Sequence, residues 1–428
     1  MMTKIKGNPD LGGMSATIGF FIGFAAVSLF GVTATKIKEF MPVGPALLGL
    51  LISIPALSGS LLRIPFAAWT DTTGGRKPFL VLLVLSIIGM LGLYVVMGRF
   101  YPDHLSEKFY PVFLLLGVLC GCGIATFSVG IGQVSYWFPQ NKQGTVLGLF
   151  AGLGNLAPGI FALLLPFAMK ELGFSVTYLA WLIFLVTGTA VYWLLGRNAW
   201  YFQLLEQGME IEEAKKEARN HYHQEIFPKG NAKQSLQLSA QNWKTWALVS
   251  IYFATFGGFI ALTAWFPTYW ISFYQLALVE AGMLTALYSI LASLMRVVGG
   301  QIADIYGGER TLIFSLCVMI TGAVVMFASG TFAVSILGCV LLAVGMGMSN
   351  AAVFKLVPQD VPEAVGGAAG WVGGLGAFGG FVIPPMMGFI ANLLGQEGYS
   401  KGFGIFVILS VMALILTFVL KSQRQVKA

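Results

Sequence analysis

The chain has 428 residues, of which 57% are hydrophobic and only 10% carry a charged side chain, and its mean hydropathy is +0.80. A soluble domain of this length needs far more charged surface, so the composition excludes one and indicates a helical protein that crosses a membrane many times. The net charge of +7 comes mostly from the connecting loops. We interpret it as a topology signal and expect no nucleic-acid partner.

Apolar runs long enough to cross a bilayer recur twelve times along the chain. A helix needs about 20 mostly apolar residues to span the hydrocarbon layer. The predicted spans of the first half begin at Met14, Val43, Pro78, Pro111, Gly144 and Val176, and those of the second half begin at Trp243, Ala281, Thr311, Val334, Gly366 and Gly402. The predicted fold is therefore an all-α membrane protein with 12 transmembrane helices.

One long polar segment separates the sixth span from the seventh and divides the chain into three predicted parts. These are a six-helix bundle over 1–196, a linker over 197–243 and a second six-helix bundle over 244–428. Within the linker, the stretch 210–219 places Glu212 and Lys216 four residues apart. This spacing favours a short helix in water or on the membrane surface, so we expect no catalytic domain there.

The distribution of lysine and arginine gives the predicted orientation. With the N-terminus inside, 16 of these residues fall on the inner side and six on the outer side. Because positively charged loops stay in the cytoplasm, we expect both termini and the linker to be cytoplasmic and the protein to lie in the cytoplasmic (inner) membrane. The remaining three lie inside spans, and these are Arg63, Arg296 and Lys355.

Two of the cations inside spans occupy matching positions in the two halves. Arg63 lies in Ser60-Leu-Leu-Arg63, and Arg296 lies in Ser293-Leu-Met-Arg296, 233 residues later. In both copies an aspartate follows eight residues after the arginine, and a Gly-Gly pair follows eleven and twelve residues after it. This repetition indicates two homologous halves, each placing one arginine at the same depth.

The depth of the two arginines follows from the helix rise. Asp71 and Asp304 mark the water boundary, and eight residues at about 1.5 Å each put each arginine about 12 Å inside, near the bilayer midplane. An arginine at this depth is costly unless it faces a polar cavity or a partner. None of the 18 acidic residues lies in the middle of an apolar run. This weakens the alternative of structural ion pairs, and two unpaired cations predict an anionic ligand.

Two further features repeat in both halves. The loops 71–77 and 304–310 share the pattern Asp-x-x-Gly-Gly followed by Arg or Glu and then by Lys or Arg. This pattern resembles the loop signature of the major facilitator superfamily, whose six-plus-six layout fits the whole chain and implies two pseudo-symmetric six-helix bundles. Two glycine-dense stretches also share Gly-Leu-Gly at a separation of 222 residues. The four glycines expected to act in gating, with tight helix packing as the alternative, are Gly152, Gly154, Gly374 and Gly376.

Within that superfamily the chain resembles the nitrate/nitrite porters of the NarK type. The resemblance rests on the stretches 60–65, 127–144, 152–155, 252–259 and 296–304, together with the glycines of the eleventh span. It implies a transporter of nitrate and nitrite that works by alternating access in nitrate assimilation. No enzyme activity, cofactor or metal is expected, because no nucleophile–base pair or metal-ligand cluster occurs in any span. We expect the functional unit to be a monomer.

The resemblance also implies which residues bind the substrate. It places nitrate between Arg63 and Arg296 and between the rings of Phe127 and Phe256. Tyr252 and Asn155 are then hydrogen-bonding neighbours. Without the resemblance, plain helix packing is the expected role of either phenylalanine in a chain that contains 34 of them.

Lys355 lies three residues before Pro358, near the predicted inner end of its span. Its side chain either reaches the cytoplasmic surface or has a role in attracting anions or in coupling. The related porters have a neutral residue at this place, which leaves both nitrate/nitrite exchange and nitrate/proton symport open. The absence of a carboxylate from the middle of any apolar run favours exchange.

Two other functions compete with nitrate transport. An organic-phosphate or phosphate antiporter also uses paired midplane arginines, but such a site usually needs further Lys or His, and none lies at that depth here. A nitrate sensor that does not transport is the second alternative. The short linker without a signalling domain argues against it.

Overall fold

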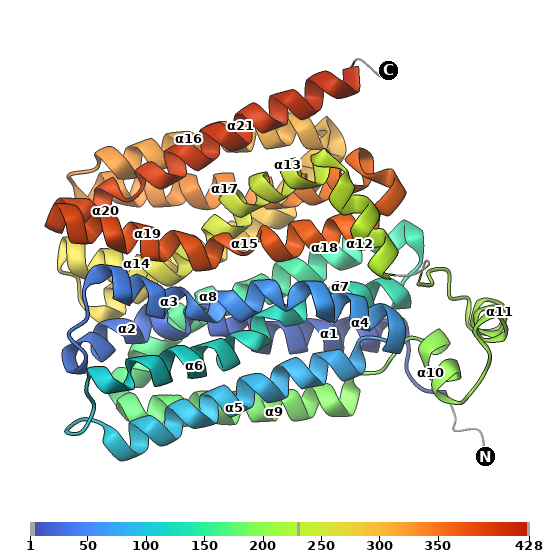
Figure 1. The fold of residues 1–428 in the computed structure, drawn as a ribbon, viewed down its shortest axis with the longest axis horizontal. Coiled ribbons are helices and arrows are strands. Elements are labelled where there is room, and N and C mark those ends of the chain that lie inside the picture. Colours follow the sequence, from blue (N-terminus) through green and yellow to red (C-terminus); the bar gives the residue numbers. More distant parts are fainter. Residues whose placement is uncertain (1–4, 229–231, 426–428) are drawn as a thin grey trace.

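The computed structural model describes residues 5–228 and 232–425, which form helices and connecting turns without a β-strand. Twelve helical spans in this part of the chain are long and apolar enough to cross a membrane. The predicted all-α fold class and the number of spans are thereby confirmed. Figure 1 shows the spans running side by side, with the linker helices at one end of the molecule. We refer to this end as the linker end and to the opposite one as the far end.

The first six spans form one bundle. Their helices are α1 (Pro9–Phe24), α2 (Leu29–Phe40), α3 (Pro45–Leu61), α4 (Arg63–Thr73), α5 (Arg76–Phe100), α6 (Tyr110–Gly121), α7 (Thr126–Trp137), α8 (Gln143–Leu172) and α9 (Phe174–Leu195). Three spans consist of two helices each, because 3₁₀ turns at Ala25–Ser28 and Cys122–Ala125 and a break at Leu62 interrupt them.

The last six spans form the second bundle. Their helices are α13 (Trp243–Tyr252), α14 (Gly258–Tyr274), α15 (Leu278–Tyr306), α16 (Gly308–Ala328), α17 (Phe332–Asp360), α18 (Val365–Leu375), α19 (Gly379–Leu394), α20 (Gly398–Lys401) and α21 (Gly404–Gln425). A π-helical turn at Phe253–Gly257 joins α13 to α14, and a turn at 376–378 separates α18 from α19. The predicted starts are close to the observed ones; the largest difference is in the first span, which begins at Pro9 instead of Met14.

The linker contains α10 (Trp200–Glu206), α11 (Ile211–Tyr222) and α12 (Ala232–Gln241). In α11 the ion pair of Glu212 is with Lys215, at 2.8 Å, instead of the expected Lys216; residues three apart are also neighbours on a helix surface. The Trp200 ring of α10 lies 4.9 Å from Trp137 in the first bundle. On the other side, the Trp371 indole of α18 donates to the Leu236 carbonyl of α12.

The linker is therefore attached to both bundles. The exact division of the chain at 197 and 243 stays a prediction.

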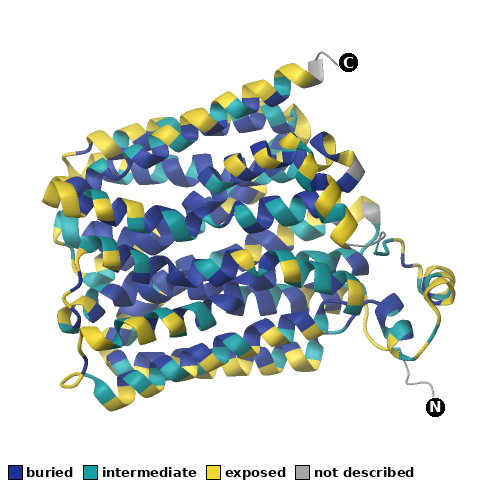
Figure 2. Ribbon diagram, in the orientation of Figure 1, coloured by how far each residue is buried: buried dark blue, intermediate teal, exposed yellow. Residues whose placement is uncertain are grey.

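Spans one and seven lie in the centre of the molecule. Of their most apolar segments, 83% and 89% of the residues are buried, whereas the value for the last span is 33%. Figure 2 shows buried residues where spans face one another and exposed residues along the outer helices α5, α9 and α21. The exposed side chains on these outer helices include large apolar ones such as Val84, Leu194 and Ile408, which suits contact with lipid.

Candidate functional site

Arg63 and Arg296 come together where the two bundles meet. Arg63 begins α4 directly after the break at Leu62, and Arg296 lies within α15. Only 0% and 9% of their respective surfaces are exposed. The guanidinium carbon of Arg63 lies 4.8 Å from the ring centre of Phe127 and 5.2 Å from that of Phe256. The corresponding distances from Arg296 are 5.7 and 5.3 Å, so both cations lie over the same two rings.

The hydrogen-bonding capacity of the two guanidinium groups is only partly used. Nε of Arg63 donates to the Gly59 carbonyl at 3.1 Å, and Nη1 donates to the Gly373 carbonyl of the other bundle at 2.9 Å. Nη2 of Arg63 and Nη1 of Arg296 are buried without a hydrogen-bond partner. Neither arginine forms an ion pair with any carboxylate in the described residues. Unpaired buried donors are costly, and an anion would satisfy them.

The two aromatic rings come from different bundles. Phe127 lies on α7, and Phe256 lies in the π-helical turn. Their centres are 6.1 Å apart and their planes differ by 31°. Tyr252 stacks on Phe256 with a centre separation of 4.8 Å and an angle of 14°. Tyr252 precedes Phe256 by about one helical turn and therefore holds the Phe256 ring from one side.

Tyr252 and Asn155 each bury a polar atom without a partner. The Tyr252 hydroxyl and the Asn155 side-chain oxygen are both inaccessible and form no hydrogen bond. The backbone carbonyl of Asn155 accepts a bond of 2.8 Å from the hydroxyl of Ser293. Ser293 is the serine three residues before Arg296, so this bond fixes Asn155 against the turn that precedes the second arginine.

Other aromatic side chains extend the site in ways that sequence reasoning missed. Phe20 lies 5.3 Å from Phe127, and Phe24 stacks on Phe256 at 6.4 Å. The ring of Phe354 lies 6.0 Å from the Arg296 guanidinium. The only available signal was that Phe20 and Phe24 share one helix face, which does not distinguish them from the other phenylalanines.

The four glycines singled out in the sequence divide into two kinds of contact. A Cβ atom on Gly152 would lie 2.8 Å from Val297, and one on Gly374 would lie 2.7 Å from Ile64, in each case in the other bundle. By contrast, Cβ atoms on Gly154 and Gly376 would collide with Phe20 and Tyr252, respectively, within their own bundles. The first glycine of each pair thus lies between the bundles, and the second packs inside one.

Lys355 lies at the linker end, where its ammonium group pairs with Asp304. The lysine side chain is 28% exposed, so it reaches the surface of the molecule. The first bundle has a matching contact, in which the Tyr136 hydroxyl donates to Asp71 at 2.6 Å. Tyr136 precedes Pro139 by three residues, as Lys355 precedes Pro358. In both halves, the side chain three residues before a proline therefore contacts the loop aspartate. A role of Lys355 in coupling stays a prediction.

The repeated loops end their preceding helices in the same way. Gly74 and Gly307, each three residues after the loop aspartate, have φ values of +75° and +89°. Glycine adopts this backbone region without the steric cost that a side chain adds. In the first loop, the Asn198 side chain accepts from the Arg76 backbone N–H and donates to the Thr73 carbonyl. The first glycine of each Gly-Gly pair is therefore explained by backbone conformation.

Comparison with known proteins supports this description of the fold. A curated relative, the "Probable nitrate transporter NarT" of Staphylococcus haemolyticus, is 27% identical over 97% of both chains. The protein with the same description from Staphylococcus aureus strain N315 is 26% identical over 98% of this chain and 97% of its own. The resemblance to nitrate porters is thereby confirmed.

Solved structures of transporters share the fold. The partially occluded, inward-open xylose transporter XylE from E. coli aligns with a TM-score of 0.72 at 15% identity, covering 97% of this chain and 99% of its own. An inward-facing bacterial homologue of the human lysosomal transporter Spinster aligns with a TM-score of 0.66 at 15% identity, covering 97% and 98%. The family model described as Major Facilitator Superfamily matches residues 16–384. The chain is a multi-pass membrane transporter, not an enzyme, and it belongs to the Major Facilitator Superfamily.

Proposed function

We propose that this transporter carries nitrate and nitrite across the cytoplasmic membrane by alternating access. One observation carries the proposal: Arg63 and Arg296 each bury an N–H donor without a partner over the same two aromatic rings. The names of the two staphylococcal relatives point to the same substrate. With the linker on the cytoplasmic side, the far end of the molecule faces outward.

The chemistry of the site suits a small flat anion. Guanidinium groups donate in their own plane, so two of them can hold the edge of nitrate, and ring faces can cover its flat surfaces. Contact with both faces needs a ring separation of about 7 Å, whereas the centres of Phe127 and Phe256 are 6.1 Å apart. Binding between the rings therefore requires them to separate by about 1 Å. A tetrahedral dianion needs a wider gap and more positive charge.

The anion also links substrate binding to the movement of the bundles. Two guanidinium groups near each other repel, and an anion between them offsets this repulsion and allows the bundles to close around it. If closure requires an anion, only the loaded transporter reorients. Exchange of nitrate for nitrite follows from this, and the described residues around the arginines offer no carboxylate as a proton carrier.

Counterflow in proteoliposomes tests the proposal. Isotopically labelled nitrate is added outside vesicles that contain nitrate, nitrite, phosphate or no exchangeable anion, with and without a pH gradient. We expect rapid uptake only against internal nitrate or nitrite, and no dependence on the gradient. Uptake that requires an inward proton gradient would replace exchange by symport. The absence of saturable nitrate transport would overturn the proposed substrate.

A further inference from the structure

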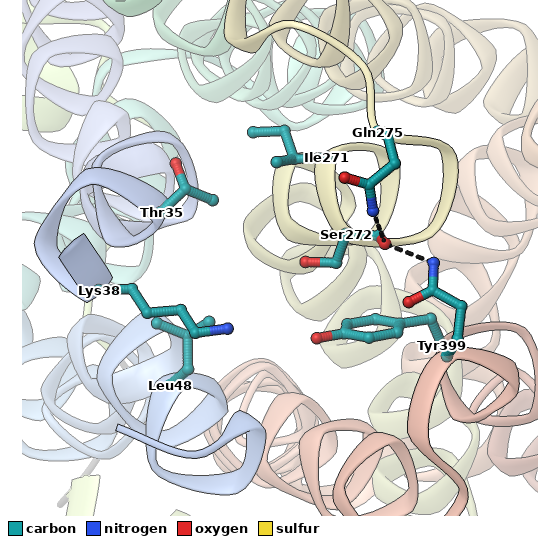
Figure 3. Close-up of a pocket in the computed structure, with 8 residues that line it drawn as sticks. Thr35, Lys38, Leu48, Ile271, Ser272, Gln275 and Tyr399 are labelled. Atoms are coloured by element: carbon teal, nitrogen blue, oxygen red, sulfur yellow. Dashed lines mark hydrogen bonds between the residues drawn. The ribbon is translucent and has the colours of Figure 1, made fainter. Parts of the chain in front are cut away.

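A cleft of about 330 Å³ lies at the far end, between the two bundles and away from the arginines. The first bundle contributes Thr35 and Lys38 from the end of α2. The second contributes Ser272 and Gln275 from the end of α14, and Tyr399 from α20. Figure 3 shows the Lys38 ammonium and the Tyr399 hydroxyl pointing toward each other across this space. The cleft therefore depends on both bundles for its shape.

The charge balance of the cleft is positive. Lys38 forms no ion pair in the described part of the chain, whereas its neighbour Lys36 pairs with Glu39 at 3.1 Å. None of the described residues that line the cleft is acidic. The hydroxyl groups of Ser272 and Tyr399 face the same space from the opposite wall as further donors (Figure 3). One cation with neutral donors matches a small monovalent anion.

The wall contributed by the second bundle is fixed by its own hydrogen bonds. The Gln396 amide donates to the carbonyl oxygens of Ser272 and Phe273, at 2.6 and 3.0 Å. The Gln275 amide donates to the same Ser272 carbonyl at 2.9 Å. These bonds join the end of span eleven to the end of span seven, so Ser272 is positioned independently of the first bundle.

We propose that this cleft is a low-affinity capture site for the transported monovalent anion, at the mouth of the pathway on the far side. The inference rests on the proposed function. From the cleft toward Arg63, the way is closed by close contact between α2 and α14, where a Cβ atom on Gly31 would lie 2.6 Å from the Ala264 carbonyl. Separation of these helices joins the cleft to the central site. Lys38 raises the local anion concentration before that step.

The test compares two substitutions that remove the same charge from the same helix end. Nitrate counterflow is measured with Lys38→Gln and Lys36→Gln, in vesicles of right-side-out and inside-out orientation. We expect Lys38→Gln to raise the KM for nitrate by about 3- to 10-fold from the far side only, with the maximal rate unchanged. Lys36→Gln should change the KM by less than about twofold, because Lys36 does not line the cleft. Lys38→Arg keeps the positive charge, so it should keep the wild-type KM.

The outcomes separate the cleft from the central site. An unchanged KM in Lys38→Gln overturns the capture site while nitrate transport by the wild-type protein still stands. Equal effects of Lys38→Gln and Lys36→Gln, or equal effects from both sides, also overturn it, since they indicate only a diffuse surface charge. If the wild-type protein shows no nitrate counterflow, the proposed function itself is wrong.

Discussion

Nη1 of Arg63 donates to the carbonyl oxygen of Gly373, 2.9 Å away in the other bundle. Gly373 lies near the end of α18, just before the turn at 376–378 that interrupts span eleven. An anion that takes this donor would break a bond between the bundles next to this turn. Substrate binding and the position of α18 are thus connected through one guanidinium group.

Replacement of either central arginine by lysine is expected to abolish nitrate exchange. Lysine keeps the positive charge but lacks the planar set of N–H donors of arginine. These donors can bind two oxygens of nitrate at once, or one nitrate oxygen and a backbone carbonyl. For Arg63→Lys and Arg296→Lys, we expect counterflow to fall by at least about 100-fold, which corresponds to about 2.7 kcal/mol. Arg99→Lys, at an exposed position, is the control and should behave as the wild type. Wild-type rates in either central variant would contradict the binding site.

The rings of Phe127 and Phe256 are expected to determine which anions are accepted. Replacement by leucine keeps much of the volume but removes the flat face, so nitrate should lose affinity relative to chloride. We expect Phe127→Leu and Phe256→Leu to raise the KM for nitrate about 10-fold and to allow more inhibition by chloride. Phe113→Leu removes a buried ring outside the site and serves as the control for packing. The same selectivity in all three variants would exclude a binding role for the rings.

Substitutions of the two glycines in span five are expected to have different effects, one on the movement of the bundles and the other on the stability of the fold. Gly154→Ala forces a methyl group against Phe20 inside the bundle, so it should destabilise the protein by about 1–3 kcal/mol. Gly152→Ala places the methyl group against Val297 of the other bundle, so it should slow exchange with little change in Tm. Gly148→Ala meets no atom within 4 Å and is the control. Thermal unfolding in detergent and counterflow measure the two effects; a large Tm loss in Gly152→Ala would contradict this division.

The central arginines could be predicted from the sequence because a charge within an apolar run is rare and costly, and because the spacing repeats. Their hydrogen bonds could not. The bond from Arg63 to Gly373 joins residues 310 apart, and backbone carbonyls carry no sequence signal. Phe20 and Phe24 were missed for a related reason: phenylalanine is common throughout the spans of this chain, so its type does not indicate its position.

The interruptions within spans also could not be predicted from the sequence patterns. The π-helical turn at Phe253–Gly257 brings Phe256 into the site, yet the segment contains no proline that would indicate a break. Such a turn depends on what packs against it: a Cβ atom on Gly257 would lie 2.7 Å from the Gly376 carbonyl. Helix length and composition determine that a segment spans the membrane, whereas contacts between spans determine where it bends.

The ion pair of Lys355 with Asp304 is expected to contribute little to stability and not to be required for exchange. The two side chains are 28% and 76% exposed, and a pair of this kind typically contributes about 1 kcal/mol or less. Lys355→Met, Asp304→Asn and the double variant should each keep nitrate counterflow, and the single effects on Tm should not add. Tyr136→Phe, which removes the matching contact to Asp71, is the control from the first bundle. Loss of exchange in Lys355→Met alone would instead assign this lysine to coupling.

Gly31→Ala is expected to hold the transporter open at the far end. The added methyl group would lie 2.6 Å from the Ala264 carbonyl of the other bundle, and a backbone carbonyl has no rotamer by which it can move away. The bundles must therefore separate where α2 meets α14, and the population shifts toward the state that is open there. Gly44→Ala is the matched control, because its methyl group meets only Asn392 at 3.6 Å.

Spin labels on Glu39 and Gln275, which are exposed on opposite bundles, should report longer distances in Gly31→Ala than in Gly44→Ala. Identical distance distributions would mean that α2 slides along α14 to relieve the contact, and the far end would then close by a route other than this helix pair.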